Sequence, residues 1–497
     1  MVFSSLFFLF FFLTLCCGLY IFMPTLKARN RLLLIFSLIF YAWAGPVYVG
    51  LLCLMTLICW GGALLMPPLR ILTPAGVIRR TGKVALRMRK AMLIVTVTAC
   101  LALLCLFKYT DFLVLNWQSL FRLEKSVPGV VLPIGISFYT FQLISYVADV
   151  YRGTVLPQRK YGQLLLYASL FPQCVAGPIV RYADVDRDIT GRRASTNDIF
   201  EGLMRFTVGL AKKAILTNAC ASVADTLLPL DAAGYGDRSA LAVLIGMTAY
   251  MMQIYLDFSA YSDMAIGMAR MFGFRFRENF NYPYTAGSVT EFWRRWHISL
   301  SSFFRDYVYI PLGGSRCGTA RQILNLFVVW ALTGLWHGAS WNFVLWGLYF
   351  WLLLLLEKFV FKWNVEEHGR RLWLRRLWTL AAVWFGWFLF RFENLSLMGS
   401  ALRSLFGGGA GFSDKLAVTI LRNNLWILLL CVLACTPVVP WLGGLVRRLR
   451  GSRSTVGRAV GSLVGNTAAL IVPAALLILS ALALAGNSYN PFMYTRF

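Results

Sequence analysis

The sequence predicts an all-α, polytopic (multi-pass) membrane protein, and two observations support this prediction. Hydrophobic residues make up 59% of the 497 positions and charged residues only 14%, a balance that a water-soluble fold of this length could not hide from water. Apolar stretches of spanning length recur from one end of the chain to the other, without a long polar segment between them. We therefore expect a single membrane domain over residues 1–497.

The first apolar stretches predict three crossings. Residues 2–23 lack the basic start and the small-residue cleavage site of a signal peptide, so we expect a retained span. The short loop that follows and the loop at 67–90 contain Lys and Arg but no acid, which is typical of cytoplasmic loops. The apolar stretch 32–66 between them must then cross twice, with a turn at Gly45-Pro46. The N-terminus is expected on the outer face.

The remaining apolar stretches predict further spans. The basic loop at 447–458 precedes the last span, which should run outward and leave a tail at 486–497 on the outer face. The segment 163–180 has prolines and glycines in an apolar run, which predicts a re-entrant or broken helix lining a cavity. The segment 275–314 is too polar for a span and predicts amphipathic pieces along the membrane surface. The expected spans are 91–107, 127–150, 240–272, 377–392, 424–446 and about 460–485.

The net charge of +27 would suggest a nucleic-acid partner in a soluble protein. Here the Lys and Arg residues lie in short loops between spans, and no basic run is interleaved with exposed aromatics, so we expect the lipid bilayer and no nucleic acid as a partner. Most of the eleven cysteines lie inside apolar runs and show no metal or redox spacing.

One histidine stands where hydrocarbon is expected. Residues 322–356 carry no formal charge, and His337 lies near their middle. An ionisable side chain at bilayer depth is costly unless it faces a cavity or a partner, which favours a functional role. A neutral histidine hydrogen-bonded between helices is the alternative. Because basic residues flank this stretch on both sides, we expect a hairpin with His337 deep inside, although one long tilted helix is an alternative.

The other titratable candidates are weaker. His368 lies in a charged loop and is expected in solvent, whereas His297 lies on an aromatic and basic segment that suits packing or a site equally. Asp257 and Asp263 fall on different faces of an apolar helix, where a structural role is at least as plausible as a catalytic one. Two histidines without Cys or carboxylate at ligand spacing make a poor metal site, so we expect no metal; a buried neutral imidazole suits general-base chemistry.

Several motifs resemble those of one known family. The run Gly334-Leu-Trp336-His337-Gly338, continuing through Trp341-Asn342 to Trp346-Gly347, resembles the active-site motif of the membrane-bound O-acyltransferase family. Residues 292–300 and 304–314 resemble the family's second signature, and residues 132–139 and 171–179 resemble the pieces that precede it. The match runs in order over a core at about 30–395, with the spans within 424–485 beyond it. The chain most resembles the bacterial branch that acetylates exopolysaccharides.

This resemblance implies a fold and an activity. It implies about 11 transmembrane helices, with re-entrant and interfacial helices around a central funnel. His337 would be the essential catalytic histidine and His297 a second important one. The donor would be cytosolic acetyl-CoA, held by its phosphates at the basic cytoplasmic rim, with no bound cofactor. The acetyl group would pass to a periplasmic SGNH-hydrolase-like acetyltransferase partner that decorates a polysaccharide, which places the chain in a bacterial inner membrane.

The C-terminus supplies a further resemblance. Phe492, Tyr494 and Phe497 fit the Phe-x-Tyr-x-x-Phe ending of this branch, in which the tyrosine is proposed to carry the acyl group as a transient ester. A phenol has a pKa near 10, close to that of a thiol, so an aryl ester keeps most of a thioester's transfer potential. An aromatic anchor at the outer interface is the alternative.

We expect His337 to accept the proton of an attacking hydroxyl, such as that of Tyr494. Indole or amide donors such as Trp336 or Asn342 would stabilise the oxyanion. The same fold moving D-alanine or another acyl group toward teichoic acid or peptidoglycan is one alternative, and a polytopic transporter is another. The polymer (alginate, cellulose, peptidoglycan or another glycan) stays open. The channel and substrate-contact candidates are Trp336, Asn342, Trp296, Arg294, Arg305, Asp257 and Gln173.

Overall fold

The computed structural model describes residues 2–72, 78–80, 82–122, 127–175, 177–231, 238–363, 369–452 and 454–486. In these ranges the regular secondary structure is helical apart from one small antiparallel hairpin of strands β1 (Arg70–Leu72) and β2 (Ile78–Arg80). The predicted all-α membrane class is confirmed. Among the described residues, six helices are long and apolar enough to cross a membrane: Pro46–Leu64, Lys83–Phe121, Ala240–Met271, Trp341–Phe361, Lys415–Ala434 and Thr455–Gly486.

The N-terminal helices follow the predicted crossings at the start and depart from them later. The predicted turn is confirmed, because Gly45 has the positive φ of 152° that glycine tolerates best and Pro46 opens the next helix. One predicted boundary is wrong: the loop before the next helix ends by residue 82 and not at residue 90. The predicted span 91–107 lies within a single longer helix from Lys83 to Phe121. The elements are η1 (Phe8–Leu13), α1 (Thr14–Phe22), α2 (Leu26–Ala42), α3 (Pro46–Leu64) and α4 (Lys83–Phe121).

The predicted broken helix is confirmed. At Leu170 the backbone leaves the helical region, with φ −51° and ψ 112°, and Pro172 then restarts a short helix. Residues 164–174 are all buried, so this break lies inside the protein. The elements of this part are α5 (Ile136–Arg152), α6 (Tyr161–Ser169), α7 (Phe171–Cys174) and α8 (Tyr182–Gly191).

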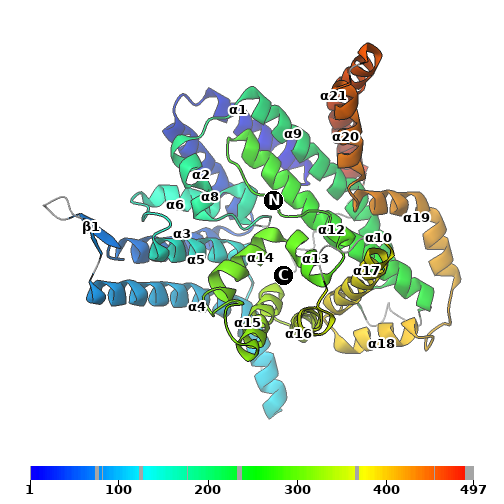
Figure 1. The fold of residues 1–497 in the computed structure, drawn as a ribbon, viewed down its shortest axis with the longest axis horizontal. Helices are drawn as coiled ribbons and strands as arrows, with labels where there is room; N and C mark the ends of the chain where they lie inside the picture. Colours follow the sequence, from blue (N-terminus) through cyan, green and yellow to red (C-terminus); the bar gives the residue numbers. More distant parts are fainter. Residues whose placement is uncertain are drawn as a thin grey trace.

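A long helical segment that the sequence did not predict packs along the central helix α12 (Ala240–Met271). It consists of α9 (Thr196–Ala211), η2 (Lys212–Thr217) and α10 (Asn218–Leu227), which follow one another without a break. Its charged residues make it too polar for an apolar span, but several of them pair with carboxylates on α12. Figure 1 shows α9, α10 and α12 side by side across the molecule.

Short helices lie in the middle of the fold. They are η3 (Pro283–Thr285), α13 (Val289–Arg295), α14 (Ile298–Phe304) and η4 (Arg305–Tyr309). The predicted short helical pieces are present, and many of their side chains are buried against other parts of the protein. Phe292, Trp296, His297, Leu300 and Phe303 are buried, because their aromatic and apolar side chains pack against the surrounding longer helices. Figure 1 shows α13 and α14 with those longer helices around them.

The stretch around His337 forms the predicted hairpin of α15 (Thr319–His337) and α16 (Trp341–Leu355), extended by η5 (Leu356–Phe361). The two helices pack closely through small residues: a Cβ at Gly347 would lie 2.6 Å from the Trp330 carbonyl oxygen. The next helix, α17 (Arg370–Arg391), contains the predicted span 377–392 except its last residue.

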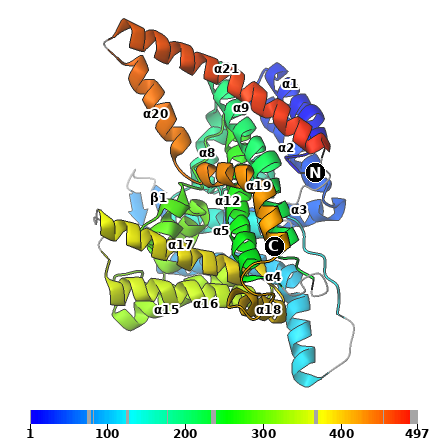
Figure 2. The same cartoon turned by 90° about the vertical axis from the view of Figure 1, so that its right-hand side faces the viewer.

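The C-terminal helices contain one wrong prediction and one confirmed one. The expected span 424–446 is broken near Pro437, between α19 (Lys415–Ala434) and α20 (Val438–Arg450). The last span lies within α21 (Thr455–Gly486), and α18 (Leu395–Leu405) precedes this group. Figure 2 shows α20 and the start of α21 projecting from the body, while the rest of α21 lies along α9.

Two groups of buried apolar residues form the core. The first joins the N-terminal helices, α5 to α8 and the second half of α12, and includes Trp336. The second joins α10, the first half of α12, α13 and α15 to α19, and includes Trp296, Trp346 and Phe390. His337 contacts rings of both groups, so it lies where the two cores meet.

Candidate active site

His337 is the last residue of α15 and is buried, with 7% of its surface exposed. Its ring centroid lies 4.9 Å from that of Trp336, 4.9 Å from that of Trp346 and 5.1 Å from that of Phe390, all in edge-to-face orientation. After it the chain extends at Gly338 before α16 begins at Trp341. The turn of the hairpin thus presents the imidazole inside an aromatic cage rather than to lipid.

His297 lies on the other side of Trp336. It is 1% exposed, and its ring centroid is 5.9 Å from that of Trp336 and 4.7 Å from that of Phe258. Its backbone is left-handed, with φ 43°, directly before α14. A side chain held in this region costs about 1–3 kcal/mol, and such strain is frequent at functional sites. The fold therefore brings together two histidines that lie far apart in the sequence.

Asn279 determines which nitrogen of His297 carries the proton. The Asn279 Oδ1 atom accepts hydrogen bonds from the Ser299 backbone N–H at 3.1 Å and hydroxyl at 2.9 Å, and it lies 3.2 Å from His297 Nδ1. The Asn279 amide donates to the Ser262 hydroxyl at 3.2 Å, which fixes its orientation. The Ser299 hydroxyl also lies 3.3 Å from Nδ1 but already donates to Asn279 Oδ1. An acceptor facing Nδ1 favours a proton there and leaves Nε2 as the basic nitrogen. Within the described residues, Nε2 is buried and has no hydrogen-bond partner.

A lysine that the sequence did not single out reaches the same place. Lys108 of α4 is 9% exposed, and its ammonium donates a hydrogen bond to the Trp336 carbonyl. Lys108, Ser137, Trp336 and His337 are among the residues that line a cavity of about 20 Å³. This volume holds about one water molecule. The available signal was a lone lysine directly after the predicted span 91–107.

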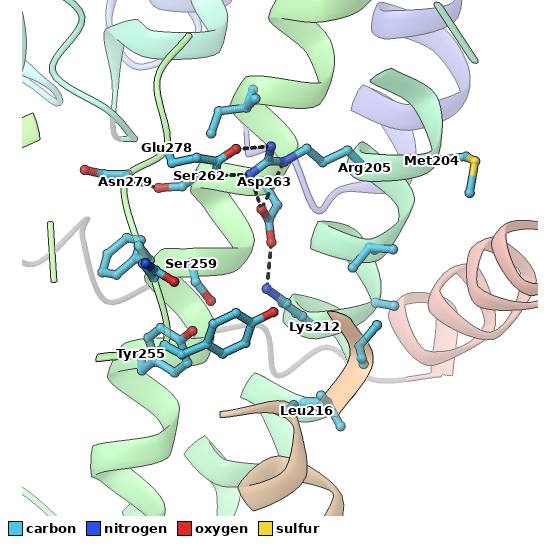
Figure 3. A pocket seen from close by; sticks show the side chains of 18 of the residues that line it. Met204, Arg205, Lys212, Leu216, Tyr255, Ser259, Ser262, Asp263, Glu278 and Asn279 are labelled. Atoms are coloured by element: carbon cyan, nitrogen blue, oxygen red, sulfur yellow. Dashed lines mark hydrogen bonds and ion pairs between the residues drawn. The ribbon is translucent and has the colours of Figure 1, made fainter. Parts of the chain in front are cut away.

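A much larger cavity lies beside His297. This vestibule has a volume of about 1090 Å³ and lies between α9, η2 and α12, the segment 278–282, and residues from α19 to α21. Figure 3 shows the ion pairs on its wall, where Asp263 accepts from Arg205 at 3.0 Å and from Lys212 at 2.6 Å, and Arg205 also pairs with Glu278. Asn279, the hydrogen-bond partner of His297, lines the vestibule too.

A third cavity of about 630 Å³ has arginines and carboxylates in its wall, among them Arg152, Arg181 and Asp306. Burial alone would raise the pKa of the Asp306 carboxyl, but hydrogen bonds from Arg305 and Arg181 lower that pKa below its ordinary value. Arg181 lies 2.7 Å from Asp306. The Arg305 predicted as a substrate contact is exposed and bonds to its neighbour Asp306 at 2.6 Å.

The other candidates are placed as follows. Asp257 forms an ion pair with Lys213 at 2.9 Å, and both side chains are 2% exposed. The Asn342 amide donates to the Phe390 carbonyl at 3.1 Å and so ties α16 to α17. Gln173 donates to the Tyr167 carbonyl at 2.6 Å.

Trp296 is buried among aromatic rings, and Arg294 is exposed. Tyr494 and His368 lie outside the described residues. Among the described residues, no group of three or more His, Cys, Asp or Glu could hold a metal ion. The structure therefore gathers His337, His297 and Trp336 in one place, while the exposed arginines lie elsewhere on the surface.

Comparison with known proteins gives concordant matches. Residues 159–400 match the model of MBOAT, the membrane-bound O-acyltransferase family. The probable alginate O-acetylase AlgI of Pseudomonas putida is 36% identical to this chain over the full length of both. The peptidoglycan O-acetyltransferase of Helicobacter pylori is 32% identical over 64% of this chain and 65% of its own length. The teichoic acid D-alanyltransferase of Bacillus subtilis is 28% identical over 46% of this chain and 60% of its own.

Proposed function

Because the chain belongs to the membrane-bound O-acyltransferase family, we propose that it moves an acetyl group from cytosolic acetyl-CoA across the inner membrane toward polysaccharide hydroxyls. The chain is a multi-pass membrane protein and an O-acyltransferase, which favours the enzyme over the transporter considered above. The full-length similarity to alginate O-acetylases supports acetyl as the acyl group and a polysaccharide as the final acceptor.

The observation that carries this proposal is the arrangement of two buried imidazoles around Trp336, with a different cavity on each side. His337 lines the cavity of about 20 Å³, and the vestibule of about 1090 Å³ reaches His297 through Asn279. Donor and acceptor that come from opposite faces of a membrane need two approaches to one reacting centre. The two cavities supply these approaches in our proposal.

In the proposed reaction His337 is the general base. It takes the proton of the acceptor hydroxyl as that oxygen bonds to the thioester carbonyl carbon, and the carbon–sulfur bond then breaks. The proton passes to the departing thiolate, so the products are an acetyl ester and free CoA thiol. Positioned general-base catalysis contributes about 10²- to 10⁴-fold to such rates. The buried Nε2 of His297, the ring nitrogen turned away from Asn279, provides a second proton acceptor near Trp336.

The acceptor hydroxyl in this proposal is that of Tyr494, which passes the acetyl group to a periplasmic SGNH-hydrolase-like partner. Tyr494 lies eight positions beyond Gly486, the last described residue, so it can reach at most about 28 Å from there. Leu476 of the same helix lines the vestibule. The reach of the tail therefore allows Tyr494 to enter the vestibule in our proposal.

The test is incubation of the purified chain with radiolabelled acetyl-CoA, followed by mass spectrometry of the C-terminal peptide. We expect release of CoA thiol and a peptide heavier by one acetyl group at Tyr494, both lost in Tyr494→Phe. An undiminished rate in Tyr494→Phe would limit this residue to anchoring. A D-alanyl carrier protein as donor tests the alternative acyl group. Substrate transport without any covalent product would contradict the proposal.

A further inference from the structure

Helix α4 holds the last turn of α15 through two adjacent residues. The Lys108 ammonium donates to the Trp336 carbonyl, and the Tyr109 hydroxyl donates to the Leu335 carbonyl. The last four carbonyls of a helix have no partner within that helix, and helix ends fray. His337 is the final residue of α15, so the candidate catalytic residue stands where a helix is least constrained by its own hydrogen bonds.

Lys108 strengthens this hold in its protonated form. Hydrogen bonds from a charged donor are stronger than those between neutral groups. A cation also interacts favourably with the negative end of the helix dipole. The ammonium lies 5.9 Å from the centre of the Trp336 ring, which adds a cation–π contact.

Burying a cation at the position of Lys108 is energetically unfavourable. It is buried within the 39-residue helix α4, one of the helices apolar enough to cross a membrane. A lysine in such a helix faces the interior or a cavity and marks function by default. Lys108 faces the cavity of about 20 Å³ that it shares with His337 and Trp336.

We propose that Lys108 is a positioning residue for acyl transfer: it holds the Trp336 carbonyl and thereby fixes the His337 imidazole between Trp346 and Phe390. This inference rests on the proposed function of His337. Tyr109 assists from the next position but supplies the weaker, neutral hydrogen bond. A displacement of about 1 Å at a reacting group can lower a rate about 100-fold, so a loosened last turn would reduce turnover.

The test measures kcat and KM for acetyl-CoA in purified full-length variants, normalised to the monodisperse folded fraction. We expect Lys108→Met to lower kcat about 100-fold with KM within twofold of the unmodified protein. Lys108→Arg, which keeps a cationic donor, should recover at least a tenth of the original kcat. Tyr109→Phe should lower kcat less than Lys108→Met does. Lys415→Met, an exposed lysine at the start of α19, is the matched control and should leave kcat unchanged.

The inference is wrong if Lys108→Met keeps kcat within twofold, or if Lys108→Arg is as inactive as Lys108→Met. If Lys108→Met fails to fold, Lys108→Arg and Tyr109→Phe test the inference. A full kcat in Tyr109→Phe together with less than a tenth of the original kcat in Lys108→Arg would overturn it. His337→Ala separates this inference from the function on which it rests. Undiminished acetyl transfer in His337→Ala would overturn the proposed function. If His337→Ala loses acetyl transfer while Lys108→Met keeps it, only the role of Lys108 is overturned.

Discussion

Replacing Lys213 with methionine breaks an ion pair that is sealed inside the protein. Lys213 of η2 and Asp257 of α12 lie 2.9 Å apart, and each side chain is 2% exposed. Removing one partner leaves the other charge buried without its counter-ion, which costs about 3–5 kcal/mol. The folding equilibrium of Lys213→Met should therefore shift by roughly two to four powers of ten toward the unfolded state.

The double variant Lys213→Met/Asp257→Leu should recover most of this loss. Apolar residues of similar size in place of a buried ion pair are often neutral or stabilising. Arg277→Ala is the exposed control: Arg277 is 76% exposed and pairs with Asp184 at 2.6 Å, so its loss should cost at most about 1 kcal/mol.

The assay is equilibrium unfolding of purified protein in mixed micelles with a rising fraction of sodium dodecyl sulfate, followed by acetyl transfer in the native micelles. A Lys213→Met variant within about 1 kcal/mol of the unmodified protein would refute the reasoning. A double variant that is no more stable than Lys213→Met would also refute the reasoning. A double variant that is stable but inactive would indicate that the Lys213–Asp257 pair serves acyl transfer in addition to stability.

Three further outcomes are expected. Gly347→Ala places a Cβ 2.6 Å from a backbone oxygen of α15 and should cost about 1–3 kcal/mol in the same unfolding assay; unchanged stability would contradict the close packing. Asn279→Ala removes the acceptor for His297 Nδ1 and should lower kcat about 100-fold at normal folded yield; an unchanged kcat would exclude an orienting role. Asp306 has a pKa below its usual 3.8 in the fold, so its charged form contributes stability above that value and loses it as pH falls further. The stability advantage over Asp306→Asn should therefore shrink as pH falls through 3.8 toward the lowered pKa, and a constant difference would oppose the assignment.

The sequence predicted the parts of the fold whose signals are local. Gly45-Pro46 breaks an apolar stretch at a turn, and basic residues on both sides of the stretch around His337 indicate a hairpin. The break before Pro172 has an equally local cause. Each of these predictions depends on neighbouring residues only, and the structure confirms each.

The helical segment 196–227 was missed because its polarity has a distant cause. Lys212 and Lys213 raise its charge beyond that of an apolar span, and their carboxylate partners lie on α12. Nothing in the local pattern reveals such pairing. The central position of α13 and α14 was missed for the same reason, since the rings that cover them come from helices far along the chain.

The candidate site was predictable in its residues more than in its geometry. His337 follows from a titratable group in an uncharged stretch, whereas His297 gained weight only from the family resemblance. Their approach around Trp336 is a tertiary contact. Lys108 was missed because its partner is a backbone carbonyl more than two hundred positions away, and a carbonyl leaves no sequence signal.

The central claim is that the His337 imidazole takes the proton of the acceptor hydroxyl. Its most direct test is the initial rate of CoA thiol release from acetyl-CoA by purified His337→Ala, compared with the unmodified protein and with a His368→Ala control. The account predicts a loss of about 10²- to 10⁴-fold for His337→Ala at an unchanged folded yield, and no loss for His368→Ala. A His337→Ala rate within a few-fold of the unmodified protein would contradict it.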